Sequence, residues 1–475
     1  MNLTEPIRRI ARERPRDAAV VEGERTYSFT ELWSAISRMA GWFRRRGLQP
    51  GQRVLVWIPN GFAFLAVHLG AIAAGLLSIP IKAENGPVEF EFAVRDAKPL
   101  LLIAERALVA RSPHGAPHGL QWSAVDELPV EGPLLDAVPE AVPDDHPASA
   151  IYSYVFGEGR PYAAVLTHGN HLFLGHQCQP FFLIDPGDHI LILLPMLHVF
   201  PMGMGILPAF YCGATIHVGD ATRPRAILET ITRHRITHIP AVPQVFEQLA
   251  RCHNREKYDL RSIKHLTSGA DFLPEEVHRR IESTLGVMVV QGYGMTETFP
   301  SICNPPAGVN RAGTLGIGFH SSIRFRITKD GGAELPAGEI GEIEVHSPGN
   351  MAGYLDAPEA TARLKQNGWM RSGDAGYVGA GGYLHFSGLQ KPIVNISGNK
   401  IDAREVAATI ERMEGVESAR VSGVATPSPS GIPDVVLRAE VQIDPRASIV
   451  ERDIRAHCRT WLAPYKVPQR VELYR

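Results

Sequence analysis

A glycine-rich segment, QGYGMTE at 291–297, combines several side chains suited to chemistry. Tyr293 supplies an aromatic face, Thr296 a hydroxyl and Glu297 a carboxylate, and an apolar run before them predicts a buried strand. Ligands of open α/β sheets bind beyond the carboxyl ends of strands. The segment therefore indicates either a ligand site or a turn whose tyrosine only packs.

The surrounding elements predict a largely parallel α/β sheet. Ser28 and Glu31 form a capping box before apolar residues at helical spacing; Gly47 marks the helix end, and the strand RVLVWI follows. A second helix opens at Pro274 and ends at Gly286, before the strand VMVVQ. Strands that alternate with helices are typical of a parallel sheet covered by helices.

A smaller α+β unit is predicted near the C-terminal end. After Gly382 a strand and a turn precede a helix from Asp402 to Met413, whose cap we expect Glu405 to complete. Two strands and a last helix from Ser448 follow.

Composition and charge exclude several classes of function. The 475 residues are 44% hydrophobic and 21% charged, which predicts a globular protein of more than one domain. The chain has 48 Lys and Arg residues against 50 Asp and Glu residues. It therefore lacks the excess of basic residues that is typical of nucleic-acid-binding proteins. The five cysteines show no metal-ligand spacing, and no signal segment stands at the start, which predicts a cytoplasmic protein with reduced thiols.

One uncharged segment, Phe62 to Ile81, has roughly the length of a bilayer span. Gly70, Gly75 and Pro80 interrupt it. We therefore predict a buried helix followed by a buried strand, and no membrane span.

Several motifs together give the chain a resemblance to a known family. QGYGMTE resembles the signature of the adenylate-forming superfamily, which includes acyl-CoA and aryl-acid ligases, luciferases and nonribosomal adenylation domains. Segments similar to other motifs of that family are LPMLHVF (194–200), HIPAVP (238–243), TSGA (267–270), GEIGEI (338–343), MAGY (351–354) and WMRSGD (369–374). The likeness extends from the capped helix at Ser28 to YKVP at 465–468, which is nearly the whole chain.

The resemblance implies an α/β fold of two parts. Residues 1–386 would form an acyl- and nucleotide-binding domain of packed, mostly parallel sheets with helices and a small β-barrel-like subdomain. Residues 387–475 would form a small α+β lid domain. The implied cofactors are AMP, ATP or acyl-AMP, Mg²⁺, and CoA or phosphopantetheine. The implied partners are a small carboxylic acid or its activated form, and an acyl carrier protein.

The resemblance also implies roles in a nucleotide site. Tyr293 would stack on adenine, and Asp374, a pure hydrogen-bond acceptor, would bind the ribose hydroxyls. Thr296 would contact the α-phosphate, and Glu297 would hold Mg²⁺. The full implied set is Ser268, Gly269, Ala270, Tyr293, Gly294, Thr296, Glu297 and Asp374.

Two further roles are implied for the acyl and thiol groups. His198 would form a wall of the acyl pocket and would be catalytic together with Thr296 and Glu297. Gly398, in the Ser397-Gly398 turn, would border the tunnel for the pantetheine arm.

The phosphate loop departs from the family pattern. Where the family has [ST]-[ST]-G-[ST]-T-G-x-P-K-G, this chain has YVFGEGRPYA at 154–163. The hydroxyl donors are missing, Tyr162 replaces the lysine, and Glu158 adds a carboxylate that repels a pyrophosphate.

The C-terminal unit departs from the pattern twice. The D-R-K-K hinge aligns with GLQK, whose leucine cannot donate a hydrogen bond, and the chain reaches Arg475 without the family's terminal lysine segment. Lys391, Lys400 and Lys466 are the candidates for a replacement lysine. Loss of one preorganised charge stabiliser commonly costs ~10²–10³ in rate, so we expect a degenerate member with an impaired or absent ATP-dependent half-reaction.

Three functions are compatible with these features. The first is a ligase-like enzyme that transfers the acyl group of an acyl adenylate to a thiol, of CoA or carrier-protein pantetheine, or to an amine, a step helped chiefly by proximity. The second is a conventional ATP-dependent acyl-CoA ligase with an unusual phosphate loop. The third is a non-catalytic protein that binds a nucleotide or an acyl carrier.

Overall fold

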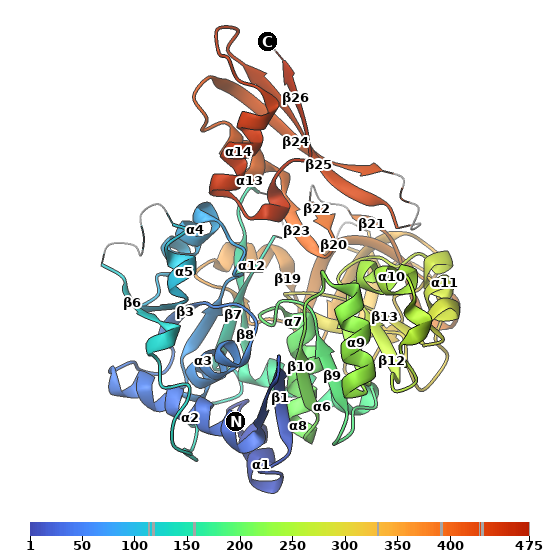
Figure 1. Cartoon of the computed structure of the whole chain (residues 1–475). Coiled ribbons are helices and arrows are strands. Elements are labelled where there is room, and N and C mark those ends of the chain that lie inside the picture. The colour runs from blue at the N-terminus through green and yellow to red at the C-terminus, as the bar shows by residue number, and fades with distance from the viewer. Residues whose placement is uncertain are drawn as a thin grey trace.

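The chain folds as a mixed α/β protein with a smaller C-terminal unit (Figure 1). The computed structural model describes residues 1–112, 115, 119–154, 158–329, 332–389, 393–426, 428 and 432–474. The C-terminal unit, orange to red in Figure 1, stands above the two large sheets. The α/β class predicted from the alternation of elements is confirmed.

The larger sheet has nine strands in the order β15-β14-β13-β12-β11-β9-β10-β1-β2. Strands β13, β12, β11, β9, β10 and β1 are parallel, and the strands at both ends are antiparallel to their neighbours. The bounds are β1 Ala18–Glu22, β2 Arg25–Ser28, β9 His189–Ile192, β10 Thr215–Val218, β11 His238–Ala241, β12 His265–Ser268, β13 Val289–Met295, β14 Phe299–Cys303 and β15 Ile317–Gly318.

The second sheet has seven strands in the order β18-β8-β7-β4-β3-β5-β6. Its central strands are parallel, and β8 runs antiparallel to both β7 and β18. The bounds are β3 Arg53–Trp57, β4 Leu77–Pro80, β5 Leu101–Ala104, β6 Gln121–Ala124, β7 Pro147–Ser153, β8 Tyr162–Thr167 and β18 Gly353–Tyr354.

Helices connect and cover these sheets. They are α1 Glu5–Glu13, α2 Phe29–Arg45, α3 Phe62–Ala73, α4 Pro87–Ala97, α5 Arg106–Val109, α6 His168–Phe181, α7 Val199–Pro201, α8 Leu207–Cys212, α9 Pro224–His234, α10 Pro243–Arg251, α11 Glu275–Leu285 and α12 Pro358–Leu364. The largest apolar cluster joins α2 and α3 to strands of both sheets, for example through Ile36, Leu65, Val54 and Ile190. One continuous core therefore holds the two sheets together.

Local sequence signals correctly locate the ends of two helices. At α2 the Ser28 hydroxyl accepts from the Glu31 backbone N–H and the Glu31 carboxylate accepts from the Ser28 N–H, which is the predicted capping box. At α11 Gly286 adopts a left-handed conformation, with φ of 67°, directly after the last helical residue.

The uncharged segment from Phe62 to Ile81 forms α3 and the buried strand β4, as predicted. Within the described ranges, no helix is long and apolar enough to cross a membrane.

A third, antiparallel sheet stands where the small barrel-like subdomain is expected. It pairs in the order β16-β17-β20-β19, and β21 also pairs with β20. The bounds are β16 Arg324–Thr328, β17 Gly341–His346, β19 Lys365–Gln366, β20 Trp369–Val378 and β21 Leu384–Leu389. The predicted domain boundary at 386/387 falls inside β21, and the division stays a prediction.

The C-terminal unit combines a hairpin, a three-stranded sheet and helices. Its elements are β22 Ile393–Ile396, β23 Asn399–Asp402, α13 Ala403–Ile410, β24 Val416–Thr426, β25 Asp434–Ile443, α14 Glu451–Trp461 and β26 Arg470–Tyr474. Asp402 caps α13 by accepting a hydrogen bond from the Arg404 N–H. The expected cap contribution of Glu405 is wrong, because its carboxylate points to Lys466 instead.

Candidate active site

A cavity of about 1430 Å³ opens where the two large sheets, the antiparallel sheet and the C-terminal unit meet. The sequence-predicted residues that line it are His198, Gly269, Ala270, Tyr293, Gly294, Thr296, Asp374 and Gly398. They come from the carboxyl ends of β9, β12 and β13, from β20, and from the β22–β23 turn. Ser268 and Glu297 are fully buried and lie behind the wall.

Tyr293 and Asp374, the candidates for binding adenine and ribose, are linked by a hydrogen bond. The Tyr293 hydroxyl donates to Asp374 Oδ2 over 2.8 Å, joining β13 to β20. Burial, followed by the neighbouring Asp374 charge, raises the pKa of Tyr293 well above its usual value, so the phenol stays a donor. Nearby, Gly269 admits no side chain without a shift, since a Cβ there would lie 3.0 Å from the Phe200 ring.

Glu297 is a single carboxylate, so the protein by itself would supply only one ligand to a metal ion. Its Oε1 accepts from the Tyr354 hydroxyl over 2.8 Å, and its Oε2 has no hydrogen-bond partner in the part of the chain that the structure describes. Among those residues, no cluster of three or more His, Cys, Asp or Glu side chains could hold a metal. A single carboxylate fits Mg²⁺ only where phosphate oxygens and waters complete the shell, as Mg²⁺ commonly binds.

The segment at the position of the phosphate loop contacts the C-terminal unit. The Gly159 N–H donates to Asp402 Oδ2 over 2.6 Å, and the Tyr154 hydroxyl donates to Glu405 Oε1 over 2.7 Å. Residues 155–157, which belong to the predicted departure from the family pattern, lie outside the described residues. The described part of the loop therefore faces two carboxylates of α13 and its cap.

Tyr162 and Glu158, the two loop residues that depart most from the family pattern in charge, form a hydrogen bond with each other. The Tyr162 hydroxyl donates to Glu158 Oε2 over 2.8 Å, and Arg363 forms an ion pair with Glu158 at 2.5 Å. The Tyr162 ring lies 5.2 Å from the ring of Tyr354, the tyrosine that donates to Glu297. Tyr162 therefore packs where the family pattern has a lysine, and Arg363 neutralises the added carboxylate.

Lys466 lies in a buried cluster between the larger part of the chain and the C-terminal unit. Its Nζ lies 2.6 Å from Glu405 Oε2, 2.9 Å from Glu89 Oε1 and 3.0 Å from the Tyr154 hydroxyl. Burial by itself lowers the pKa of Lys466, but its interactions with Glu405, Tyr154 and Glu89 together outweigh burial and hold the pKa well above its usual value. Of the candidate replacement lysines, Lys466 is thus held in ion pairs with Glu89 and Glu405, while Lys391 lies outside the described residues.

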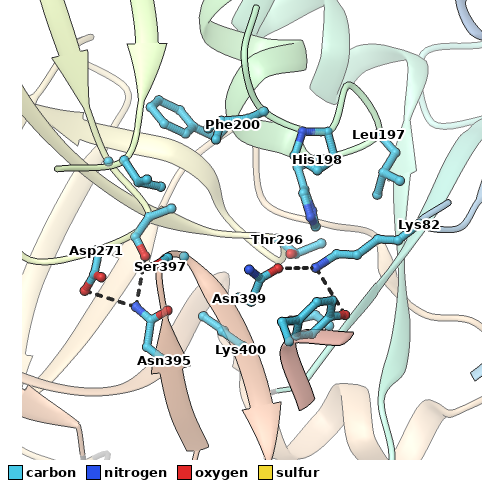
Figure 2. A pocket seen from close by; sticks show the side chains of 18 of the residues that line it. Lys82, Leu197, His198, Phe200, Asp271, Thr296, Asn395, Ser397, Asn399 and Lys400 are labelled. Atoms are coloured by element: carbon cyan, nitrogen blue, oxygen red, sulfur yellow. Dashed lines mark hydrogen bonds between the residues drawn. The ribbon is translucent and has the colours of Figure 1, made fainter. Parts of the chain in front are cut away.

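The β22–β23 hairpin lines the cavity, and Figure 2 shows its Asn395 beside Asp271 and its Asn399 beside Lys82. The Asn395 amide donates to Ala270 O at 3.1 Å and to Asp271 Oδ1 at 3.2 Å. Gly398 has a φ of 82°, and a Cβ there would lie 2.9 Å from Val242. Glycine is therefore required for this close approach.

Lys82 is a cavity residue that sequence reasoning missed. It lies two residues beyond the end of β4, and its Nζ donates to Asn399 Oδ1 over 2.8 Å. Figure 2 shows Lys82 and His198 pointing into the same part of the cavity. Burial, with a smaller effect of the Lys82 charge, lowers the pKa of His198 to about 3, so His198 is neutral. The sequence does hold a sign of this role, because Lys82 follows an apolar run that predicts a buried strand. Ligands of open α/β sheets bind beyond the carboxyl ends of such strands.

Comparisons with known proteins identify the family and the fold of this chain. The family described as AMP-binding enzyme matches residues 7–355. A feruloyl-CoA synthase from Amycolatopsis sp. is 31% identical over 98% of this chain and 94% of its own length. A sulfoacetate–CoA ligase from Cupriavidus necator is 29% identical over 89% of this chain and 84% of its own length. In fold, the chain is similar to o-succinylbenzoate CoA synthetase from Bacillus subtilis, with a TM-score of 0.86, 23% identity, and coverage of 99% and 94% of the two chains.

Proposed function

Because the chain belongs to the AMP-binding enzyme family, we propose that it binds a carboxylic acid as its acyl adenylate and transfers the acyl group to a thiol. The chain is an enzyme of the synthetase/ligase family with an acyl- or aryl-CoA ligase-like function, and ATP or AMP and CoA are the ligands that this family uses. The proposal adds that the transfer step is retained while the ATP-dependent first step is impaired.

The observation that carries this proposal is the contact between the altered phosphate loop and α13. Glu405 and Asp402 accept hydrogen bonds from Tyr154 and Gly159, where the family loop would donate to a pyrophosphate. A pyrophosphate placed there would meet carboxylates instead of donors, which is unfavourable both in charge and in hydrogen bonding.

Most of the residues expected to bind an adenylate are, in contrast, gathered in one cavity. Tyr293 would offer an aromatic face to adenine, and Asp374 would accept hydrogen bonds from the ribose diol. Thr296 supplies a hydroxyl for the α-phosphate. Gly398 brings the β22–β23 turn to the same cavity and leaves room for the arm of a thiol substrate. His198 forms a neutral wall for the acyl group.

These residues act by positioning. A bound acyl adenylate supplies the activated carbonyl, and Asp374 and Thr296 fix its ribose and its α-phosphate so that the carbonyl faces the turn at Gly398. Holding the acyl carbon and the nucleophile together accounts for most of the rate enhancement of such a transfer. Glu297 would hold Mg²⁺ against the phosphate, which would offset the charge of the leaving AMP.

The test supplies the activated acid directly. The purified chain is mixed with feruloyl-AMP or benzoyl-AMP and CoA, and thioester formation is compared with the uncatalysed rate. In parallel, pyrophosphate exchange with ATP is measured with the corresponding free acids. We expect acceleration of the first reaction and exchange slower by at least ~10²-fold than the transfer. The proposal is wrong if no acyl adenylate is converted faster than in buffer.

The likeness to a feruloyl-CoA synthase over nearly the whole chain favours a second candidate, a conventional ATP-dependent ligase. Exchange with ATP at a rate equal to the transfer would establish that function. Binding of AMP with neither reaction would instead indicate a non-catalytic protein.

A further inference from the structure

Lys82 is a cationic cavity residue to which the proposed function assigns no role. Its side chain is half-buried and lines the cavity. Its Nζ donates to the neutral Asn399 Oδ1 at 2.8 Å and lies 3.5 Å from the Tyr465 hydroxyl and 4.7 Å from the centre of that ring. Across the described ranges, no carboxylate lies within ion-pair distance of it. A partly desolvated ammonium with only neutral partners is suited to binding an anionic group.

The position of Lys82 indicates which anionic group this would be. Figure 2 shows its Nζ between His198, Thr296 and Asn399. On the proposed function, His198 borders the acyl group, Thr296 contacts the α-phosphate, and the turn next to Asn399 admits the thiol. The atom that joins these three groups is the acyl carbon. Lys82 therefore approaches the reacting carbonyl from the side of β4.

We propose that Lys82 is a catalytic residue of the transfer step and donates a hydrogen bond to the acyl oxygen as negative charge develops there. In this step the thiol sulfur forms a bond to the acyl carbon, the bond from that carbon to the phosphate oxygen breaks, and AMP leaves with the electron pair. The thiol proton goes to water. Lys82 keeps its own proton throughout, and its charge acts only on the oxygen. This inference rests on the proposed function.

The surroundings of Lys82 make its charge dependent on pH. Burial and then the charge of Lys466 lower the pKa of Lys82 to about 8, although Glu84 and Glu89 act in the opposite direction. Tyr465 and His198 face it from the other sides and are uncharged near neutral pH. Lys82 is therefore protonated below about pH 8 and becomes neutral above it.

The first experiment compares the wild type with Lys82→Met, Lys82→Gln and Lys82→Arg in the transfer from benzoyl-AMP to CoA. We expect kcat to fall ~10²-fold in the methionine and glutamine variants with a much smaller change in KM, and the arginine variant to recover part of the loss. The ratio of wild-type to Lys82→Met rates should fall as the pH rises through about 8, and the thiol's own titration cancels in that ratio. Lys257→Met, at an exposed lysine outside the cavity, serves as the matched control and should keep the wild-type rate.

Two results would overturn the role of Lys82. If Lys82→Gln keeps the wild-type kcat, the lysine serves only as a hydrogen-bond donor to Asn399. If the loss is confined to KM, the lysine binds the ground state and does not stabilise developing charge.

A binding measurement separates this inference from the proposed function. Benzoyl-sulfamoyl-adenosine, which cannot be hydrolysed, carries a negative charge next to its acyl oxygen. Calorimetry should show ~10-fold weaker binding to Lys82→Met than to the wild type at pH 7, and a smaller difference at pH 9.5. If the wild type transfers no acyl group but shows this difference, the proposed function fails and the anion site at Lys82 stands. Equal binding to both proteins, or to neither, overturns the inference.

Discussion

Replacing Lys466 by methionine removes the positive charge from a buried cluster that holds two carboxylates. Lys466 is 1% exposed, and Glu89 and Glu405 are 7% and 8% exposed. Removing one partner of a buried ion pair costs about 3–5 kcal/mol, because the remaining charge is left uncompensated. We expect Lys466→Met to lower the free energy of unfolding by about that amount at pH 8.

The effect should depend on pH in a definite direction. Burial raises the pKa of Glu405, and without Lys466 no cation in the cluster opposes that rise. An acid whose folded pKa is raised destabilises the fold above its unfolded pKa, near 4.3, and most strongly above its folded pKa. The difference between wild type and variant should therefore be largest at pH 8 and shrink as the pH falls toward about 4.5.

Urea unfolding followed by fluorescence at pH 8, 6 and 4.5 measures this difference. The double variant Lys466→Met/Glu405→Gln removes one of the two stranded carboxylates and should recover part of the loss at pH 8. Arg261→Met, which removes a 90% exposed arginine from a surface ion pair with Asp259, should leave the unfolding curve unchanged. A Lys466→Met protein that unfolds like the wild type at pH 8, or a loss that does not vary with pH, would refute the reasoning.

Three further substitutions separate the parts of the cavity. Asp374→Ala should weaken AMP binding ~10-fold or more in calorimetry, because the ribose loses a charged acceptor, whereas Tyr293→Phe, which keeps the ring, should weaken it less. Gly398→Ala should slow thioester formation ~10-fold at unchanged AMP affinity, since alanine is strained at a φ of 82° and its Cβ would meet Val242; equal rates would contradict the role of the turn. Glu297→Gln should abolish any increase in nucleotide affinity on adding Mg²⁺, and a persisting increase would place the metal elsewhere.

Much of the fold follows from local signals in the sequence. The capping box at Ser28 and the helix end at Gly286 stand where the side-chain chemistry predicts them. The uncharged segment at 62–81 is correctly read as a buried helix and strand, since its glycines and proline are incompatible with a continuous span. Such features depend on neighbours within a few residues, which a sequence displays directly.

The site was predictable only in part. Tyr293, Gly269 and Asp374, from the QGYGMTE, TSGA and WMRSGD motifs, line one cavity, whereas Ser268 and Glu297 of the first two motifs lie behind its wall. The first two motifs lie at the ends of parallel strands, whose carboxyl ends meet at one edge of a sheet. Glu405 was expected to cap its own helix and instead binds Lys466, 61 residues away. Helix position alone cannot reveal a partner that arrives from another element.

What the sequence by itself determined is therefore the family, the order of elements and the chemical types of the side chains at the site. Only the tertiary structure decided which charges remain available. It places Lys466 between Glu89 and Glu405 and leaves Lys82 facing the cavity beside Asn399. The physical reason is that a charge acts on whatever lies within a few ångströms of it, and those neighbours come from segments that are distant in the chain.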